Sequence, residues 1–459
     1  MSHQGRCGLR VECNAKELRR CLDRLLPTGV DQQFVFAESC TWSAATLIAT
    51  ALFWAWSDED TLTGRFRVAR RITTRCFFLQ QELSAAYQPF MRMLVRWSGR
   101  LQALLVAQLH DAMRAMDSFT ENGFAIFAID GSRFEVPRTA GNEQVFSPRD
   151  DNGKRKRHVR KKQTTSDQKK ATSPQVWLTT LWHVGCGLPW TWKHGESGSS
   201  EREHLLQMLP ELPDNALLTA DAGFAGYEYW KAILDSQRNF LIRVGANVKL
   251  LKKLGYARES ASRIYLWTDR AAAREQPPLV LRLVIVQGAR HPVYLVTSVL
   301  SSAQMTDSQL SKIYARRWGV ELYYRHLKQT FDLRKLRSRT AAHVVLELDW
   351  ALVGLWCVCW LAQSEGDIKP RQLSVAKALR AVRRTMREYK SDADPGEDLF
   401  TSWANARIDN YQRTCKSSRD YPRKKRKRQL NGVPSIKTAT YSQRRRAKAI
   451  KQQLPKSQG

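Results

Sequence analysis

The sequence predicts a mixed α/β protein in which a strand-rich centre is flanked by an all-helical N-terminal region and a helical, basic C-terminal region. Up to about residue 117, apolar residues recur at helical spacing and Gly is scarce. From Gly123 to about residue 300, short apolar runs bounded by polar and Gly-containing segments are typical of buried strands. Helical periodicity returns after that point, so helices are expected on both sides of the strands.

The length and composition set the domain organisation. The chain has 459 residues, 43% of them hydrophobic, which is enough to form substantial cores and excludes wholesale disorder. Its length predicts two or three domains. We expect a helical N-terminal domain over 1–117, a second domain over 118–363 with a β-rich insertion at about 240–305, a helical region over 364–410 and a basic, disordered tail over 411–459.

The N-terminal region holds one of the two most apolar stretches of the chain. These stretches are Ala44–Trp56 and Leu348–Ala362. Each is shorter than the roughly 18–20 apolar residues that span a membrane, so both are expected to be buried helices. The first residues carry no apolar segment of a secretion signal, and the nine Cys include no Cys-x-x-Cys pair, which favours a reducing compartment. No membrane partner is expected.

The centre contains apolar runs of strand length. Two of them lead directly into acidic residues, at Asp130-Gly131 and at Asp221-Ala-Gly, so both carboxylates are expected to project from strand ends beside turns. Taken singly, each Asp could merely start a turn by bonding its own backbone. The predicted strands are Phe124–Ile129, Gln175–Val184, Ala216–Ala220, Phe240–Val244, Arg263–Thr268, Leu279–Gln287 and Val293–Val299.

The next predicted helix, Asp307–Thr330, carries a third acid in a distinctive setting. Tyr314, Arg317, Glu321 and Lys328 are spaced by three, four and seven residues, which places all four on one face of a helix. A solvated, salt-bridged face would account for Arg317 with Glu321. If Glu321 faces the two strand-end aspartates, however, the three carboxylates would repel unless metal cations neutralise them. Trp318 is expected to turn away from Glu321 and to pack in the core.

The charge of the chain predicts a polyanionic partner. Its 75 Lys and Arg exceed its 43 Asp and Glu, giving a formal charge of +32, and nucleic acid is the strongest candidate. A charge of +15 lies in residues 411–459. Another Lys- and Arg-rich run, Arg149–Lys170, is expected to be a mobile loop that faces DNA. After it, further helices are expected at His343–Gln363 and Val375–Tyr389.

Together, the three acids and the Tyr-x2-Arg-x3-Glu-x6-Lys pattern resemble a known family. Asp130, Asp221 and Glu321 in this order look like the bacterial insertion-sequence transposases of the DDE type, and specifically like the hairpin-forming, cut-and-paste family numbered four. The resemblance covers about Phe124 to Gln363. It implies an RNase H-like catalytic core whose β-rich insertion lies between the second and third acids.

The resemblance also implies the chemistry of the site. Asp130, Asp221 and Glu321 would be the catalytic residues and would hold two Mg²⁺ ions, with Mn²⁺ as a substitute. Water would cut the transposon end, the freed 3′-OH would form a hairpin, water would reopen it, and the 3′-OH would join target DNA. Tyr314, Arg317 and Lys328 would contact the DNA backbone. Trp267 is the candidate platform for a base flipped out at the hairpin, against the alternative that it simply packs in the core.

The partners implied are the double-stranded terminal inverted repeats of the transposon, the target DNA and a second copy of the chain, as a homodimer in the synaptic complex. The location implied is the bacterial cytoplasm, at the nucleoid. Two other functions remain open from the sequence. One is a DDE-type, structure-selective nuclease that cleaves without joining strands, and the other is a domesticated DNA-binding protein without turnover.

Overall fold

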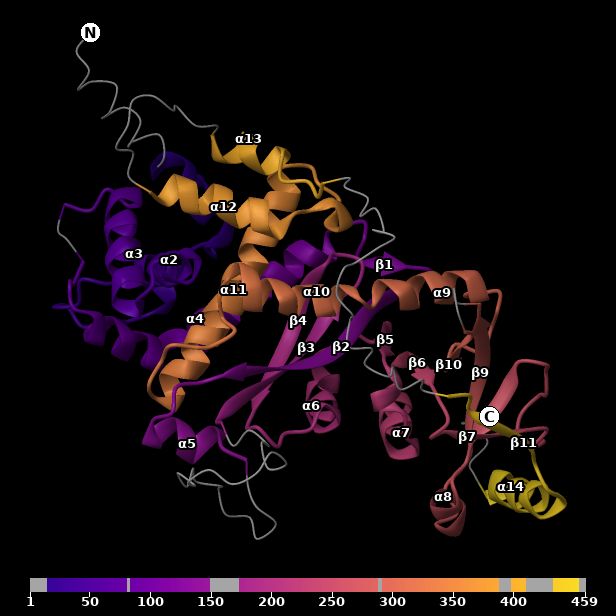
Figure 1. The fold of residues 1–459 in the computed structure, drawn as a ribbon. Helices are drawn as coiled ribbons and strands as arrows, with labels where there is room; N and C mark the ends of the chain where they lie inside the picture. Colours follow the sequence, from indigo (N-terminus) through magenta and orange to yellow (C-terminus); the bar gives the residue numbers. More distant parts are fainter. Residues whose placement is uncertain are drawn as a thin grey trace, which may run out of the picture.

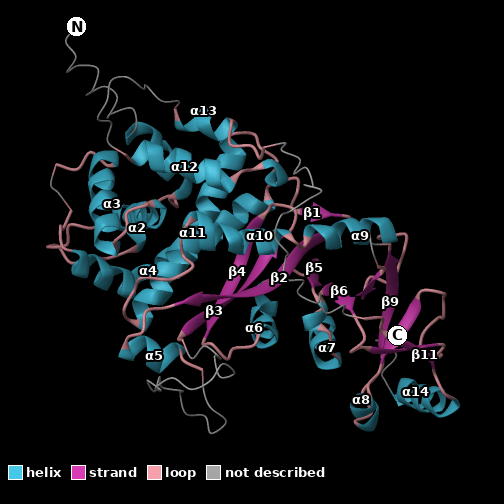
Figure 2. Cartoon of the chain, in the orientation of Figure 1, coloured by secondary structure: helices cyan, strands magenta, loops and turns pink. Residues whose placement is uncertain are grey.

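A computed structural model of the chain describes residues 15–80, 83–148, 173–287, 291–387, 398–409 and 432–453. One mixed sheet runs through this part of the molecule, and most of the longer helices gather around one end of it (Figures 1 and 2). The smaller helices α6 and α7 lie on one side of the sheet, and α9 and α10 lie on the other (Figure 1). The fold is therefore mixed α/β with a large central sheet, as the sequence predicts.

The N-terminal helices form because their apolar residues share a buried face. Residues 15–25 are helical, and α2 begins after Ser43, whose hydroxyl and that of Thr46 form a reciprocal N-terminal cap. All 13 residues of α2 are buried. This region contains η1 (Val30–Gln33), α2 (Ala44–Trp56), α3 (Leu62–Cys76) and α4 (Tyr87–Arg114).

The first part of the sheet has the strand order β4-β3-β2-β5-β6. Strand β2 pairs antiparallel with β3, which pairs antiparallel with β4, whereas β5 runs parallel to both β2 and β6. The short β1 pairs with β2 outside this path. The strands are β1 (Thr120–Glu121), β2 (Phe124–Glu135), β3 (Gln175–His183), β4 (Leu188–Gly195), β5 (Ala216–Ala220) and β6 (Asn239–Val244).

The second part continues the same sheet from β6 in the order β10-β9-β8-β7-β11. Its pairings are antiparallel except the last, because β11 runs parallel to β7. The strands are β7 (Lys249–Lys252), β8 (Arg263–Leu266), β9 (Leu279–Val286), β10 (Val293–Thr297) and β11 (Ser435–Thr438).

The remaining helices connect the strands or follow them. Between strands lie α5 (Ala140–Phe146), α6 (Glu201–Met208), η2 (Leu209–Glu211), η3 (Ala222–Phe224), α7 (Tyr227–Asp235) and α8 (Asp269–Ala273). After β10 come α9 (Asp307–Arg316), α10 (Gly319–Arg325), the π-helical turn η4 (His326–Thr330), α11 (Ala341–Glu365), η5 (Pro370–Gln372), α12 (Val375–Met386), α13 (Leu399–Ala404) and α14 (Tyr441–Gln453).

Helix α11 is the centre of the helical part. It packs against α2, α4, α12 and α13, and its buried residues belong to the same hydrophobic core as the sheet. At 25 residues it is longer than the sequence predicted, and it is the one described helix long and apolar enough to cross a membrane. Most of its apolar window, 83%, is buried inside the protein, which is the property of a core helix.

The C-terminal tail corrects an expectation. We predicted disorder over 411–459, but Ser435–Thr438 forms β11 and Tyr441–Gln453 forms α14. The high charge of the tail is interrupted there by small and apolar residues, and Ala439, Ala447 and Ile450 become buried. Of the predicted tail, residues 411–431 and 454–459 lie outside the described residues, and so does the whole of the predicted Arg149–Lys170 loop.

Candidate active site

Asp130 and Asp221 lie at the same edge of two neighbouring parallel strands. The parallel pairing of β2 with β5 ends at Ala128 and Thr219, so each Asp lies two residues beyond the last pair. The sequence predicted that this strand would end just before Asp130. Strand β2 instead continues to Glu135, because it keeps pairing with β3. Its residues up to Ile129 are buried, and exposure begins at Asp130. The carboxylate is thus placed where β2 leaves the core.

Asp221 follows β5 and opens the short helical turn η3. Its carboxylate accepts a hydrogen bond of 2.8 Å from the backbone N–H of Gly223, so it also has the turn-forming role that the sequence allowed. The carbonyl of Gly223 in turn accepts a hydrogen bond of 2.7 Å from Arg202 Nε. This arrangement fixes the turn beside β5 and leaves Asp221 exposed.

Glu321 reaches the site from a helix that is interrupted twice. The expected continuous helix begins with a reciprocal cap between Thr306 and Gln309, but α9 ends at Arg316, α10 begins at Gly319, and η4 follows in π-helical form. Gly319 is required at the first break, because a Cβ there would lie 2.0 Å from the Trp182 ring. The chain keeps right-handed helical angles across both breaks, at Arg317 and at His326, so its direction is preserved.

The residues of the Tyr-x2-Arg-x3-Glu-x6-Lys pattern contact one another or the sheet. Arg317 Nη2 lies 3.1 Å from Glu321 Oε1, and the Arg317 guanidinium lies 5.6 Å from the centre of the Tyr314 ring. Lys328 Nζ donates a hydrogen bond of 2.8 Å to Ser132 Oγ on β2. Tyr324 further fixes α10 to β2, because its hydroxyl donates a bond of 2.8 Å to the Asp130 carbonyl.

A cavity of about 300 Å³ joins these groups, and we call it the acidic cavity. Asp130, Glu321 and Lys328 all line it, so three of the predicted site residues share one space. Asp221 is not among its lining residues, although its charge acts on Asp130. The described residues that line it are Asp130, Ser132, Glu321, Tyr324, Arg325, Lys328, Gln329 and Arg334.

The electrostatics of the cavity centre on Asp130. Burial raises the pKa of Asp130 to about 6, and the negative charges of Glu321 and Asp221 act in the same direction. The backbone N–H of Gly131 and the guanidinium of Arg317 oppose this shift. An ionised Asp130 is therefore a disfavoured anion that a nearby cation would stabilise.

Glu201, at the start of α6, is a fourth carboxylate that the sequence analysis missed. It packs against Gly131, where an added Cβ would lie 2.4 Å from Glu201 Oε1. Burial raises the pKa of Glu201 to about 7, with further contributions from the charges of Asp130 and Asp221. Glu201 follows β4, a strand that the sequence did not predict, so no sequence pattern distinguishes it from other acids.

The predicted aromatic contact at Trp267 is not supported. Trp267 follows β8 and is only 6% exposed, and its indole N–H donates a hydrogen bond of 2.9 Å to the Gln276 carbonyl. A ring buried in this way offers no free face to a base. The alternative, that Trp267 packs in the core, describes its position better.

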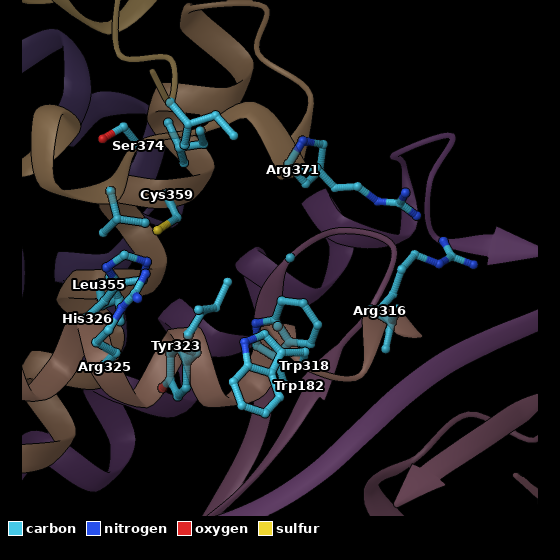
Figure 3. Close-up of a pocket in the computed structure, with 18 of the residues that line it drawn as sticks. Trp182, Arg316, Trp318, Tyr323, Arg325, His326, Leu355, Cys359, Arg371 and Ser374 are labelled. Atoms are coloured by element: carbon cyan, nitrogen blue, oxygen red, sulfur yellow. The ribbon is translucent and has the colours of Figure 1, made fainter. Parts of the chain in front are cut away.

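Trp318 also differs from expectation, because it is 56% exposed and does not pack in the core. It lines a larger cavity, of about 640 Å³, with Trp182, Tyr323 and His326 (Figure 3). Glu321 and Lys328 line the acidic cavity and are absent from this one. Helix α10 therefore separates an acidic cavity from a more aromatic one.

The donor chemistry of the site suits a divalent metal, although its side chains are not gathered into a ligand set. Within the described ranges, no group of three or more His, Cys, Asp or Glu side chains is arranged so that it could hold a metal ion. Carboxylate oxygens are nevertheless the ligands that Mg²⁺ and Mn²⁺ prefer. Burial disfavours the charge of Asp130, and the Glu201 side chain projects into the space above Gly131. Both features are consistent with a cation between Asp130 and Glu201.

Comparison with known proteins places these features in a family context. The family described as "Transposase DDE domain" matches residues 121–357, a range that contains Asp130, Asp221 and Glu321. The transposase InsG for insertion sequence element IS4 of Escherichia coli (strain K12) is 26% identical over 288 residues. That alignment covers 60% of this chain and 61% of the relative. The piggyBac transposase, in a synaptic complex with hairpin DNA, aligns with 88% of each chain at 13% identity and a TM-score of 0.40.

Proposed function

The chain belongs to the family that carries the transposase DDE domain, and from this premise we propose that it is the transposase of a bacterial insertion sequence that moves by cut-and-paste transposition. The observation that carries the proposal is the placement of the three acids. Asp130 and Asp221 lie just beyond paired parallel strands, and Glu321 shares the acidic cavity with Asp130. A site of this kind can act on the phosphodiester bonds of DNA.

We further propose that the strands β4-β3-β2-β5-β6 form an RNase H-like core. Their order and their mixture of antiparallel and parallel pairs support this assignment. Strands β7 to β10 lie in the chain between Asp221 and Glu321, which is the position expected for the β-rich insertion at about 240–305. The domain limits at 117, 363 and 410 belong to the same proposal.

In the proposed site, Asp130, Asp221 and Glu321 hold two divalent cations, Mg²⁺ or in its place Mn²⁺. When bound, such cations neutralise the carboxylates and stabilise charge on phosphate oxygens. Ionised Asp130 would be stabilised by them, because its burial disfavours the charge. To bind a cation, Glu321 must give up at least part of its contact with Arg317.

The cationic and phenolic side chains around the acids position DNA. Arg317 and Lys328 are suited to hold phosphates at the transposon end, since both lie beside the carboxylates and carry several N–H donors. Tyr314 packs next to Arg317 and supports its orientation. Ser132 holds the Lys328 ammonium close to β2.

The reaction proposed for this site has four steps. Water displaces the 3′-oxygen at the transposon end, which leaves a free 3′-OH. This hydroxyl then attacks the opposite strand and forms a hairpin, water reopens the hairpin, and the 3′-OH finally displaces an oxygen in target DNA. Each step exchanges one phosphodiester oxygen for another, so no oxidant, reductant or covalent enzyme intermediate is needed.

The partners proposed are the terminal inverted repeats of the element, the target DNA and a second copy of the chain. The helical N-terminal region would bind the repeats, and the homodimer would bring two transposon ends together in the bacterial cytoplasm. The formal charge of +32 supports binding to DNA.

The test is to incubate the full chain with linear DNA that carries the terminal repeats of its element and Mg²⁺. We expect nicks, hairpins and insertion products. Glu321→Ala should abolish cleavage and leave DNA affinity within about tenfold, or roughly 1.4 kcal/mol. Glu228→Ala, an exposed acid on α7, is the matched control and should cleave normally.

Each other outcome points to a different function. Cleavage without joining would identify a structure-selective nuclease, and DNA binding without cleavage would identify a binding protein without turnover. Unchanged cleavage by Glu321→Ala would contradict the role of the acidic cavity.

A further inference from the structure

A second polar cavity opens next to the acidic cavity, and we call it the arginine cavity. It has a volume of about 600 Å³ and lies between α12, the residues that follow α2, and η4. Gln329 of η4 lines both cavities, so the two are neighbours along the same turn of helix. The lining is Asp58, Gln329, Thr330, Ala376, Arg380, Arg383, Arg384 and Arg387.

The arginine cavity is strongly positive. Of the described residues that line it, four are Arg and one is Asp. That single acid, Asp58, pairs with Arg387. No ion pair joins Arg380 to another side chain in the part of the chain that the structure describes, and Arg380 is exposed. Among the described residues that line this cavity, the arginines therefore outnumber the acids.

Apolar residues supply the buried face of α12, although Arg383 and Arg384 also bond neighbouring segments, at the Trp56 carbonyl and at Ser402 of α13. The helix is buried through its apolar residues, among them Ala378, Leu379 and Val382. Arg383, Arg384 and Arg387 follow Arg380 by three, four and seven residues, so the four side chains lie on one side of α12 and of its C-terminal end. Like charges three or four residues apart on a helix repel one another, and a bound anion would reduce this repulsion.

Part of the arginine cavity is held in place by neutral groups. Arg383 Nε donates a hydrogen bond of 2.8 Å to the Trp56 carbonyl, and its Nη1 donates one of 3.3 Å to the Thr330 carbonyl. Carbonyl oxygens orient a guanidinium without removing its charge. Arg383 is thus fixed between α2 and η4, and it contributes positive charge at a defined position.

We propose that the arginine cavity binds phosphate groups of the DNA strand that continues from the acidic cavity. This inference rests on the proposed function, because it assumes that DNA occupies the acidic cavity. Guanidinium groups bind phosphate oxygens through paired N–H donors. The described residues of the lining include no aromatic ring that could stack on a base, so the proposed contact follows the backbone and not the sequence of the DNA.

Charge reversal at Arg380 tests the proposal, because this exposed side chain anchors no described element. The full-length wild type, Arg380→Glu and Lys369→Glu are compared for affinity to linear DNA carrying the terminal repeats, over a range of salt concentrations and without divalent metal. Lys369 is an exposed cation of the same region that does not line the arginine cavity. Arg380→Glu should make the salt dependence weaker: the negative slope of log affinity against log salt should decrease in magnitude by about one, since each phosphate contact contributes about 0.9.

Ethylation of single phosphates locates the contact. In the wild type, ethylation close to the cleaved bond should weaken binding, and in Arg380→Ala this sensitivity should disappear at one or two of those phosphates only. An unchanged slope and an unchanged ethylation pattern in both Arg380 variants would overturn the proposal. An equal loss of slope in Lys369→Glu would overturn it as well, because the effect would then reflect net charge.

The wild type separates this inference from the function on which it rests. If the wild type cleaves the DNA and the Arg380 variants bind DNA as the wild type does, only the proposed phosphate binding by the arginine cavity is refuted. If the wild type neither binds nor cleaves, the proposed function fails first.

Discussion

Asp130 is a carboxylate that the fold holds where its charge is disfavoured. Because burial raises its pKa from 3.8 to about 6, the folded protein binds a proton that the unfolded chain has released in this pH range. The stability of the metal-free protein therefore falls as pH rises from about 4 to 6 and stays lower above that. A shift of this size corresponds to about 2 to 3 kcal/mol at high pH.

We accordingly expect Asp130→Asn to stabilise the chain by about 2 kcal/mol at pH 8 in the presence of EDTA, since the neutral amide removes the disfavoured charge. The gain should shrink by roughly half at pH 5, where Asp130 is mostly protonated. Urea unfolding at pH 8, 6 and 5 measures it, with the exposed Asp60→Asn as the control. A gain that does not depend on pH would contradict the burial of this charge.

Glu201 leads to a second prediction. Because burial and the neighbouring acids raise its pKa to about 7, Glu201 becomes charged between pH 6 and pH 8. The affinity of the DNA-free protein for Mn²⁺ should rise over this range, and in Glu201→Gln the rise should be about three- to tenfold smaller, as expected for the loss of one nearby charge. Calorimetric titration with Mn²⁺ measures both affinities.

Gly131→Ala provides a matched variant, because its methyl group would displace the Glu201 carboxylate without removing it. It should flatten the pH dependence of Mn²⁺ affinity in the same way. If both variants keep the pH dependence of the wild type, Glu201 does not act on cations in the site.

Single residues differ in how far sequence predicts their position. Asp130 and Glu321 both line the acidic cavity, and their places at a strand edge and on a helix face follow from local patterns. Glu201 could not be found in this way, since it reaches Asp130 only through the packing of α6 against Gly131. The burial of Trp267 could not be predicted either, because the sequence of a strand-rich segment does not show which face of its sheet is covered.

The helix that carries Glu321 illustrates the limit at the scale of elements. The spacing of its polar residues predicts that they share one face of a single helix. In the structure the chain keeps its helical direction, but the helix is interrupted near Arg317 and again at His326. The first break accommodates Trp182 against Gly319, a contact between distant segments that no helical pattern encodes. Strand β4 was missed for a related reason, since Trp192, Lys193 and His194 interrupt its apolar character.

The docked tail provides a prediction about elements. Ile450 of α14 is 5% exposed, and β11 is held to β7 through a parallel pairing. Ile450→Asp should release α14 and loosen β11, because a charge cannot be buried there without a partner. Hydrogen exchange of the Ser435–Thr438 amides should then become at least tenfold faster, which corresponds to about 1.4 kcal/mol of lost protection.

Gln453→Asp, at an exposed position of the same helix, is the control and should leave this exchange unchanged. Slow exchange that persists in Ile450→Asp would show that β11 is held without α14.

At the scale of the whole molecule, the helical and strand-rich parts share one hydrophobic core. The predicted boundary at residue 117 falls between α4 and β1, but bonds cross it deep in the interior. Trp56 Nε1 donates a bond of 2.9 Å to the Gly354 carbonyl, and Trp350 Nε1 donates one of 2.8 Å to Ser98 Oγ. Composition and spacing locate such a boundary but do not reveal that α11 is inserted among the N-terminal helices.

A fragment of residues 1–117 should therefore not fold stably by itself, because it would expose the fully buried α2 where α11 normally packs. We expect weak helical circular dichroism and no cooperative thermal transition for the fragment, whereas the full chain should unfold cooperatively. A sharp transition in the isolated fragment would show that the N-terminal helices form an independent domain.

The pairing of β11 with β7 also affects how the protein is made. Strand β7 leaves the ribosome long before β11, so one edge of the sheet remains without its partner while the intervening chain is synthesised. Unpaired strand edges are sites where nascent chains join one another. Translation that stops before residue 435 would thus release chains with an open edge, and these should aggregate more readily than the full-length product.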